Sequence, residues 1–212
     1  MDAHLRHDPM RWQPSPERSP DGWPGPAPGA AEMPGWLSER LFDQRIVMLR
    51  GPLTGAVATS VAATLLSLDA TGPDPVQLHV ASPGGELAAA FAVVDAIDAM
   101  AAPVHAVVTA EAGGAVIVVI AAAERRSAYR HARLRLAEPR AAGVTGTADE
   151  VAAAAGQHLR ELEEVILRLA EVTGQPRSRI EDDLSAGRML SAGEARDYGL
   201  IDAVVGDDEP AG

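Results

Sequence analysis

The stretch from Val104 to Glu124, VHAVVTAEAGGAVIVVIAAAE, decides the fold. Its first part is apolar and rich in valine, which predicts a buried strand, and its last part predicts a buried helix. Small residues at the join, Ala112, Gly113 and Gly114, allow the chain to turn sharply between the two elements. Some enzymes place a nucleophile at such a strand-to-helix turn, but this turn contains no Ser, Cys or Thr.

The same stretch is also about as long as a membrane-spanning helix. Val104 to Ala123 is almost wholly apolar, and about 20 such residues are enough to cross a bilayer. However, it contains Glu111 and a pair of glycines, and Pro103 precedes it. A buried strand followed by a buried helix explains these residues better, so we expect no membrane span here.

Predicted strands and helices alternate on both sides of this stretch. We predict strands at 45–49, 76–80, 104–108, 133–136 and 202–205, and helices at 54–69, 86–100, 148–172 and 191–198 in addition to the buried helix. The run SPGG at 82–85 predicts a tight turn. Ser191 and Glu194 have the spacing of a capping box, and Thr173-Gly174 is typical of a helix end. This alternation indicates an α/β fold with a largely parallel sheet.

Composition limits the chemistry of the chain. Its 212 residues are enough for one domain with a sizeable core. The net charge of −12 argues against nucleic acid and anionic membranes as partners. Because Cys is absent, there are no disulfides and no thiolate metal sites. All 18 basic residues are Arg, which excludes Schiff-base chemistry through lysine. We expect no cofactor and no metal.

The chain divides into three parts by composition. Residues 1–35 hold half of the 16 prolines and no apolar period, which predicts a disordered arm. An alternative function of this arm is docking through Trp12, Trp23 and Trp36. We predict a folded domain at 36–206 and a flexible tail at 207–212. No apolar signal segment follows the first residues, so we expect a cytoplasmic protein.

The order of motifs resembles the ClpP family, the proteolytic subunit of the Clp protease. The resemblance covers about 39–205 and rests on RIVMLRGPL, HVASPGGELAAAFAVVDAI, LAEPRAAGVTG and VTGQPRSRIEDDLSAGRMLSAGEARDYGLIDAVV. It implies an α/β fold of the ClpP/crotonase-like type, a repeated ββα spiral with a protruding handle helix. It also implies seven-membered rings stacked in pairs through the handle helices, with an AAA+ unfoldase as partner.

The resemblance also locates the positions of a Ser-His-Asp triad. In that family a Ser attacks the peptide carbonyl, a His takes its proton and an Asp orients the His. Counting from SPGG places the Ser position at Gly114, whereas anchoring on the residues after the Ser gives Ala112. The His position falls on Ala137 and the Asp position on Gly187. None of these residues has a side chain for nucleophilic or acid–base work.

The oxyanion hole of the family uses backbone N–H groups, which survive such substitutions. By resemblance its donors are the N–H groups of Gly85 and Ala115. We therefore expect an oxyanion pocket to persist without a nucleophile. Nearby His131 is expected at the surface, and Asp182 and Asp183 are not the triad member.

Several functions fit this pattern. The leading one is a catalytically inactive ClpP-like subunit with a structural or regulatory role in a homo- or hetero-oligomer, beside an active ClpP paralogue. One alternative is a serine peptidase with displaced residues, such as Ser82 with Glu111 or Glu138. Others are a crotonase-like acyl-CoA enzyme and a homo-oligomeric scaffold unrelated to proteolysis.

The long predicted helix at 148–172 has an apolar face. Leu159, Leu162, Ile166 and Leu169 are spaced along one side of it. By resemblance this is the handle helix, and an exposed apolar surface of that length would promote aggregation of a monomer. We therefore expect these four side chains to lie in a subunit interface.

Overall fold

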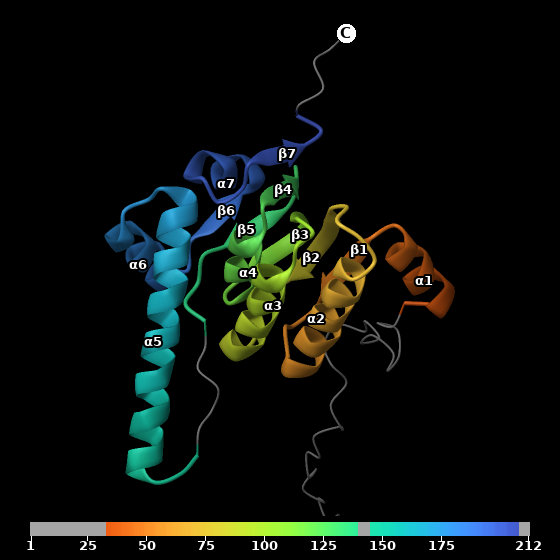
Figure 1. Cartoon of the computed structure of the whole chain (residues 1–212). Coiled ribbons are helices and arrows are strands. Elements are labelled where there is room, and N and C mark those ends of the chain that lie inside the picture. Colours follow the sequence, from red (N-terminus) through yellow and green to blue (C-terminus); the bar gives the residue numbers. More distant parts are fainter. Residues whose placement is uncertain (1–32, 140–144, 208–212) are drawn as a thin grey trace, which may run out of the picture.

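The computed structural model describes residues 33–139 and 145–207 (Figure 1). The elements follow one another as α1 (Gly35–Asp43), β1 (Ile46–Arg50), α2 (Gly55–Asp69), β2 (Val76–Ser82), α3 (Leu87–Ala99), β3 (Val104–Gly113), α4 (Val116–Ala122), β4 (Arg125–Tyr129), β5 (Arg133–Arg135), α5 (Ala148–Thr173), α6 (Arg177–Ala186), β6 (Met189–Ser191), α7 (Ala192–Tyr198) and β7 (Ala203–Val205). The alternation confirms the predicted α/β fold.

The sheet is parallel except for one strand. Its order is β1-β2-β3-β4-β7, with β5 beside the last part of β3 and β6 antiparallel to β5. Residues 105–108 of β3 pair with β4, whereas residues 111–113 pair with β5. β3 is ten residues long, so two successive strands find places along the same edge of it. At the carboxyl end of β3, the neighbouring strand is therefore β5 instead of β4.

Helices α2, α3 and α4 cover one face of the sheet (Figure 1). In β2 buried residues alternate with more exposed ones, so the strand turns one row of side chains into the core. Helix α4 has almost no exposed surface, because its residues from Val116 to Ala121 are all buried. The stretch that decides the fold is thus a buried strand followed by a buried helix, as the sequence predicts, and the strand lies at the centre of the sheet order.

The long helix α5 protrudes from the body of the domain as a handle (Figure 1). Its C-terminal half packs on α4 and α6 and buries Val165, Ile166 and Leu169. The expectation that Ile166 and Leu169 lie in a subunit interface is therefore wrong, because they belong to the core of the subunit itself. Leu162 is partly buried against that core, and only Leu159 of the four is exposed, at 64%.

Four elements have no clear sequence signal. The strand β4 reads RRSAY, so its two arginines hide the apolar pattern of a strand that lies between β3 and β7. Helices α1 and α6 and the three-residue strand β6 were likewise not predicted. The predicted tight turn at SPGG is also wrong. Gly85 instead continues in extended form and pairs in parallel with Leu53.

No helix within the described residues combines the length and the hydropathy needed to cross a membrane. Most of the predicted arm at 1–35 and of the predicted tail at 207–212 lies outside the described residues, so both stay predictions. At the boundaries, Gly35 begins α1, and Asp207 accepts a hydrogen bond from Arg130 at 2.8 Å.

Candidate functional site

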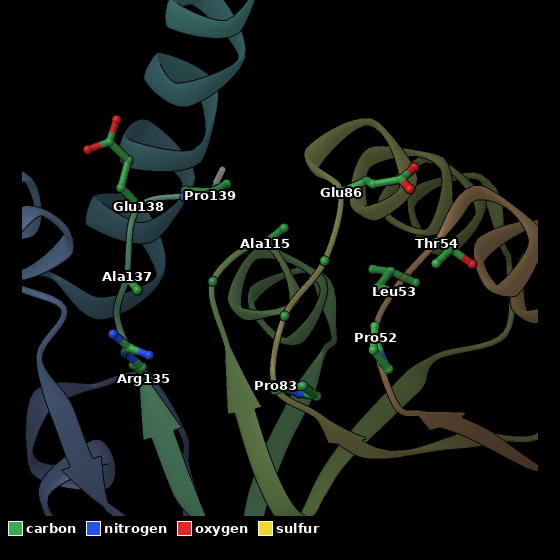
Figure 2. Close-up of a pocket in the computed structure, with 13 residues that line it drawn as sticks. Pro52, Leu53, Thr54, Pro83, Glu86, Ala115, Arg135, Ala137, Glu138 and Pro139 are labelled. Atoms are coloured by element: carbon green, nitrogen blue, oxygen red, sulfur yellow. The ribbon is translucent and has the colours of Figure 1, made fainter. Parts of the chain in front are cut away.

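A cleft opens where the carboxyl ends of β1, β2, β3 and β5 meet (Figure 2). Ligands of open α/β sheets bind in such a crevice, because the loops that leave the strands converge there. The cleft has a volume of about 610 Å³. Its lining consists of Pro52, Leu53, Thr54, Pro83, Gly84, Gly85, Glu86, Gly114, Ala115, Arg135, Ala137, Glu138 and Pro139.

One wall is the extended segment after β2. The N–H of Leu53 donates to the carbonyl of Gly84 at 2.9 Å, and the N–H of Glu86 donates to the carbonyl of Leu53 at 2.9 Å. This pairing directs the N–H of Gly85 away from Leu53, and no acceptor for it exists among residues 33–139 and 145–207. A Cβ on Gly85 would lie 2.1 Å from the Leu53 carbonyl oxygen, so only glycine fits.

The floor is the turn between β3 and α4. Gly114 has a φ of +49° and donates its N–H to the carbonyl of Arg135 at 3.2 Å. Ala115 follows as the N-cap residue of α4, and its N–H has no acceptor in the described part of the chain. Ala112, in contrast, pairs with Ser82 and Leu134 within the sheet and does not line the cleft. Of the two candidate positions, only Gly114 faces the cleft.

The opposite wall is the segment after β5. The N–H of Leu136 donates to the carbonyl of Arg188 at 2.8 Å, and that of Glu138 donates to the carbonyl of Leu184 at 3.0 Å. Ala137 lies between these two anchored residues and lines the cleft, as Figure 2 shows. Both bonds hold this wall against α6 and the residues that follow it.

Gly187 is the one predicted triad position that does not line the cleft. It ends α6, and it lies next to Arg135, because a Cβ on Gly187 would be 3.4 Å from Nη2 of that guanidinium. Arg135 itself lines the cleft and lies below Ala137 in Figure 2. A cationic side chain therefore lies beside two of the triad positions of the resemblance, Ala137 and Gly187.

Arg135 is the site residue that the sequence reasoning missed. It lies in the alternating run RLRL, where Arg133 and Arg135 are both exposed and look like ordinary surface residues of a strand. The available signal was its position, two residues before Ala137 and hence on the same wall of the cleft.

The structure does not bring together the alternative catalytic residues, Ser82 with Glu111 or Glu138. Ser82 is fully buried, and its hydroxyl donates to the carbonyl of Gly84 at 3.3 Å and accepts from the N–H of Gly84 at 3.4 Å. It does not line the cleft, and neither does Glu111, whereas Glu138 does. The one hydroxyl in the lining belongs to Thr54, which caps α2 by accepting from the N–H of Val57 at 3.4 Å.

The acidic residues near Gly187 have structural partners. Asp183 accepts hydrogen bonds from Arg188 at 3.1 Å and from the hydroxyl of Tyr198 at 2.8 Å. Burial and this hydrogen bond raise the pKa of Tyr198 above its ordinary value.

Asp182 and His131 are exposed, as expected for His131. The described residues contain no group of three His, Cys, Asp or Glu side chains that would hold a metal ion.

The arrangement can bind a negatively charged oxygen more readily than it can cleave a bond. Two N–H groups without acceptors and one guanidinium line the cleft, and these are strong donors to anions. The lining contains no His, Ser, Cys or Lys, and its two carboxylates come from Glu86 and Glu138.

Comparison with known proteins agrees with this geometry. The Clp protease family model matches residues 32–208. The chain is similar to the ATP-dependent Clp protease proteolytic subunit 1 of Chlamydia caviae, with 34% identity over 173 residues, which are 80% of this chain and 91% of that protein. The match to the family model covers every strand of the sheet and all four segments of the cleft. This chain therefore belongs to the Clp protease family.

Proposed function

We propose that this chain is a catalytically inactive proteolytic-type subunit with a structural or regulatory role in a Clp-type complex, assembled beside active ClpP-type subunits. The observation that carries the proposal is the lining of the cleft. Gly114 and Ala137, which take the Ser and His positions by resemblance, both face the cleft without a reactive group. Gly187, at the Asp position, has no carboxylate to offer.

The donors of an oxyanion hole do not replace the triad. In serine peptidases that lack triad members, the oxyanion hole and substrate binding alone leave only a small residual acceleration over water. The N–H groups of Gly85 and Ala115 are thus consistent with an inherited binding site. Proteolysis in the complex would come from the partner subunits. We further propose that the chain uses no cofactor and acts in the cytoplasm.

Exposed apolar side chains on α5 support assembly. Leu159 is 64% exposed and Leu167 is 52% exposed, on a helix that projects from the body of the domain. Apolar surface of this kind commonly marks a protein–protein interface. We propose that the handle helix contacts another subunit, in a ring assembly of the type the family resemblance implies.

The decisive experiment measures activity and serine labelling together. We expect the purified chain neither to hydrolyse casein nor to react with a fluorophosphonate probe, and we expect it to co-purify with an active ClpP-type subunit. Turnover that persists through repurification and disappears in Thr54→Ala or Ser82→Ala would overturn the proposal. The variant Gly114→Ser is the matched control, and it should stay inactive because a hydroxyl without a base is a poor nucleophile at neutral pH.

Restoring the triad should require a fourth change. A carboxylate placed at position 187 would lie within reach of the Arg135 guanidinium and would form an ion pair with it instead of orienting a histidine. We therefore expect the triple variant Gly114→Ser, Ala137→His and Gly187→Asp to remain unreactive to the probe. Adding Arg135→Met should give more labelling than the triple variant. Equal labelling of the two would show that Arg135 does not control the site.

A further inference from the structure

The cleft contains a charged group that the proposed function leaves unused. Arg135 extends from β5 into the lining of the cleft, and its guanidinium forms no ion pair or hydrogen bond within residues 33–139 and 145–207. Some arginines of the domain pair with carboxylates, for example Arg168 with Asp98 at 2.6 Å and Arg188 with Asp183 at 3.1 Å. Arg135 differs from the others without a partner in that it lines this cleft. Its guanidinium is exposed and so is available to an anion that enters the cleft.

The backbone of the cleft supplies further donors for the same kind of ligand. Gly85 and Ala115 line the cleft, and their N–H groups have no acceptor in the described residues. Gly85 is exposed, whereas Ala115 is buried in the floor. Backbone N–H groups that face a cleft without partners favour a negatively charged oxygen. The cleft therefore combines donors on two of its walls and its floor.

The carboxylates of the lining do not neutralise Arg135. Glu138 follows it on the same wall, but Figure 2 shows its carboxylate directed away from the guanidinium. Glu86 lies on the opposite wall (Figure 2), and its carboxylate lies 4.0 Å from where a Cβ on Gly55 would be, at the start of α2. Both would repel a second negative charge at the rim, so the cleft suits a ligand with a single carboxylate at its end.

We propose that the cleft binds the C-terminal carboxylate of a peptide, with the Arg135 guanidinium as its ionic partner. A guanidinium matches the planar carboxylate through two parallel hydrogen bonds. Two extended segments form facing walls, at 83–86 and 135–139, and an extended peptide fits between such segments. This inference rests on the proposed function, because peptides that end in a new carboxylate are the products that active subunits of the same complex would release by hydrolysis.

Space next to Arg135 supports this assignment. Gly187 leaves space beside the guanidinium, because a Cβ there would lie 3.4 Å from Nη2, in ordinary van der Waals contact. An aspartate at this position would supply an internal carboxylate and occupy the ionic partner. The glycine at 187 thus keeps Arg135 available for a ligand.

The test compares two peptides that differ only at the C-terminus. Acetyl-tetraalanine with a free carboxylate and the same peptide as its C-terminal amide are titrated against the full chain by calorimetry. We expect the acid to bind about tenfold more tightly than the amide or better, as for loss of a charge-assisted hydrogen bond. Equal binding of acid and amide, or no binding of the acid, would overturn the inference.

Two variants assign the preference to Arg135. Arg135→Gln should remove the preference for the acid, whereas Arg133→Gln should keep it. Arg133 is exposed on the same strand but does not line the cleft, and its guanidinium donates to the carbonyl of Ala132 at 3.0 Å. Gly187→Asp should also remove the preference although Arg135 is intact, and its melting temperature shows whether it folds. A preference that survives in Arg135→Gln would overturn the assignment, whatever the result for Gly187→Asp.

Two further measurements separate the possible outcomes. Inorganic phosphate is titrated as a competitor, and binding of phosphate without binding of the acid peptide would overturn the peptide assignment. Casein hydrolysis is measured on the same samples and reports on the proposed function alone. An inactive chain that binds acid and amide equally would contradict only this inference, whereas a chain that cleaves casein would contradict the proposed function.

Discussion

At the scale of single residues, Gly85 leaves the least room for a side chain among the glycines that line the cleft. A Cβ there would come within 2.1 Å of the Leu53 carbonyl oxygen. We expect Gly85→Ala to force the two segments apart and to lower the free energy of unfolding by about 1–3 kcal/mol, the usual cost of overpacking. Urea denaturation measures this loss.

A matched control exists in α7. No atom lies within 4 Å of a Cβ built on Gly193, and alanine is favoured over glycine in a helix. We therefore expect Gly193→Ala to leave the stability unchanged or slightly raised. If both alanine variants behaved alike, the contact between Gly85 and Leu53 would not be the constraint that we infer.

At the scale of elements, the capping box of α7 makes stability depend on pH. The hydroxyl and the N–H of Ser191 donate to the carboxylate of Glu194 at 2.6 Å and 2.8 Å. These hydrogen bonds lower the pKa of Glu194 below its ordinary value of 4.5. Their contribution to stability is present above pH 4.5 and is lost as the pH falls through the lowered pKa.

This linkage predicts the behaviour of Glu194→Gln. Glutamine keeps a capping group but cannot titrate, so the melting temperature of the variant should fall less than that of the wild type when the pH is lowered below 4.5. Asp197→Asn removes an acidic group of the same helix that takes no part in the cap, and it should follow the wild type. Parallel acid curves for wild type and Glu194→Gln would exclude a contribution from the cap.

The helix α5 divides into a buried half and a projecting half. Ile166 is buried against the core, and we expect Ile166→Ala to cost about 2–5 kcal/mol of unfolding free energy. Leu159 is 64% exposed, so Leu159→Ala should change the stability of the subunit by about 0.5 kcal/mol or less. Chemical denaturation of the isolated subunit distinguishes the two. Similar losses would mean that the projecting half packs on the domain.

At the scale of the whole molecule, assembly should depend on the exposed side chains of α5. We expect Leu159→Glu with Leu167→Glu to abolish assembly while the subunit keeps its melting temperature, because two carboxylates in an apolar interface are costly to desolvate. Sedimentation with and without an active ClpP-type partner measures the assembly. Ile166→Glu is the contrasting variant, and it should unfold the subunit because Ile166 belongs to its core. A wild type that sediments as a monomer in both conditions would contradict the proposal.

The predicted arm is tested by deletion. We expect a chain that begins at Met33 to unfold cooperatively with the melting temperature of the full chain, because 1–32 lack the apolar period that a core requires. A marked loss of melting temperature would show that this arm packs on the domain.

The sequence by itself determined the alternation of strands and helices, the resemblance to the family, and the chemical identity of Gly114, Ala137 and Gly187. These features are local, because side-chain identity and hydrophobic period are read directly along the chain. The capping box of Ser191 and Glu194 was predictable for the same reason, since its partners lie within one turn.

Only the tertiary structure decided which surfaces these residues share. The hydrophobic period predicts that Ile166 and Leu159 lie on the apolar side of a helix. It does not predict that α4 and α6 cover Ile166 and leave Leu159 exposed. Likewise, the alternation in RLRL exposes Arg135, but its contact with Gly187 and its place in the cleft arise from pairing between β3, β5 and β6. Such contacts depend on segments far apart in the chain, and no local pattern specifies them.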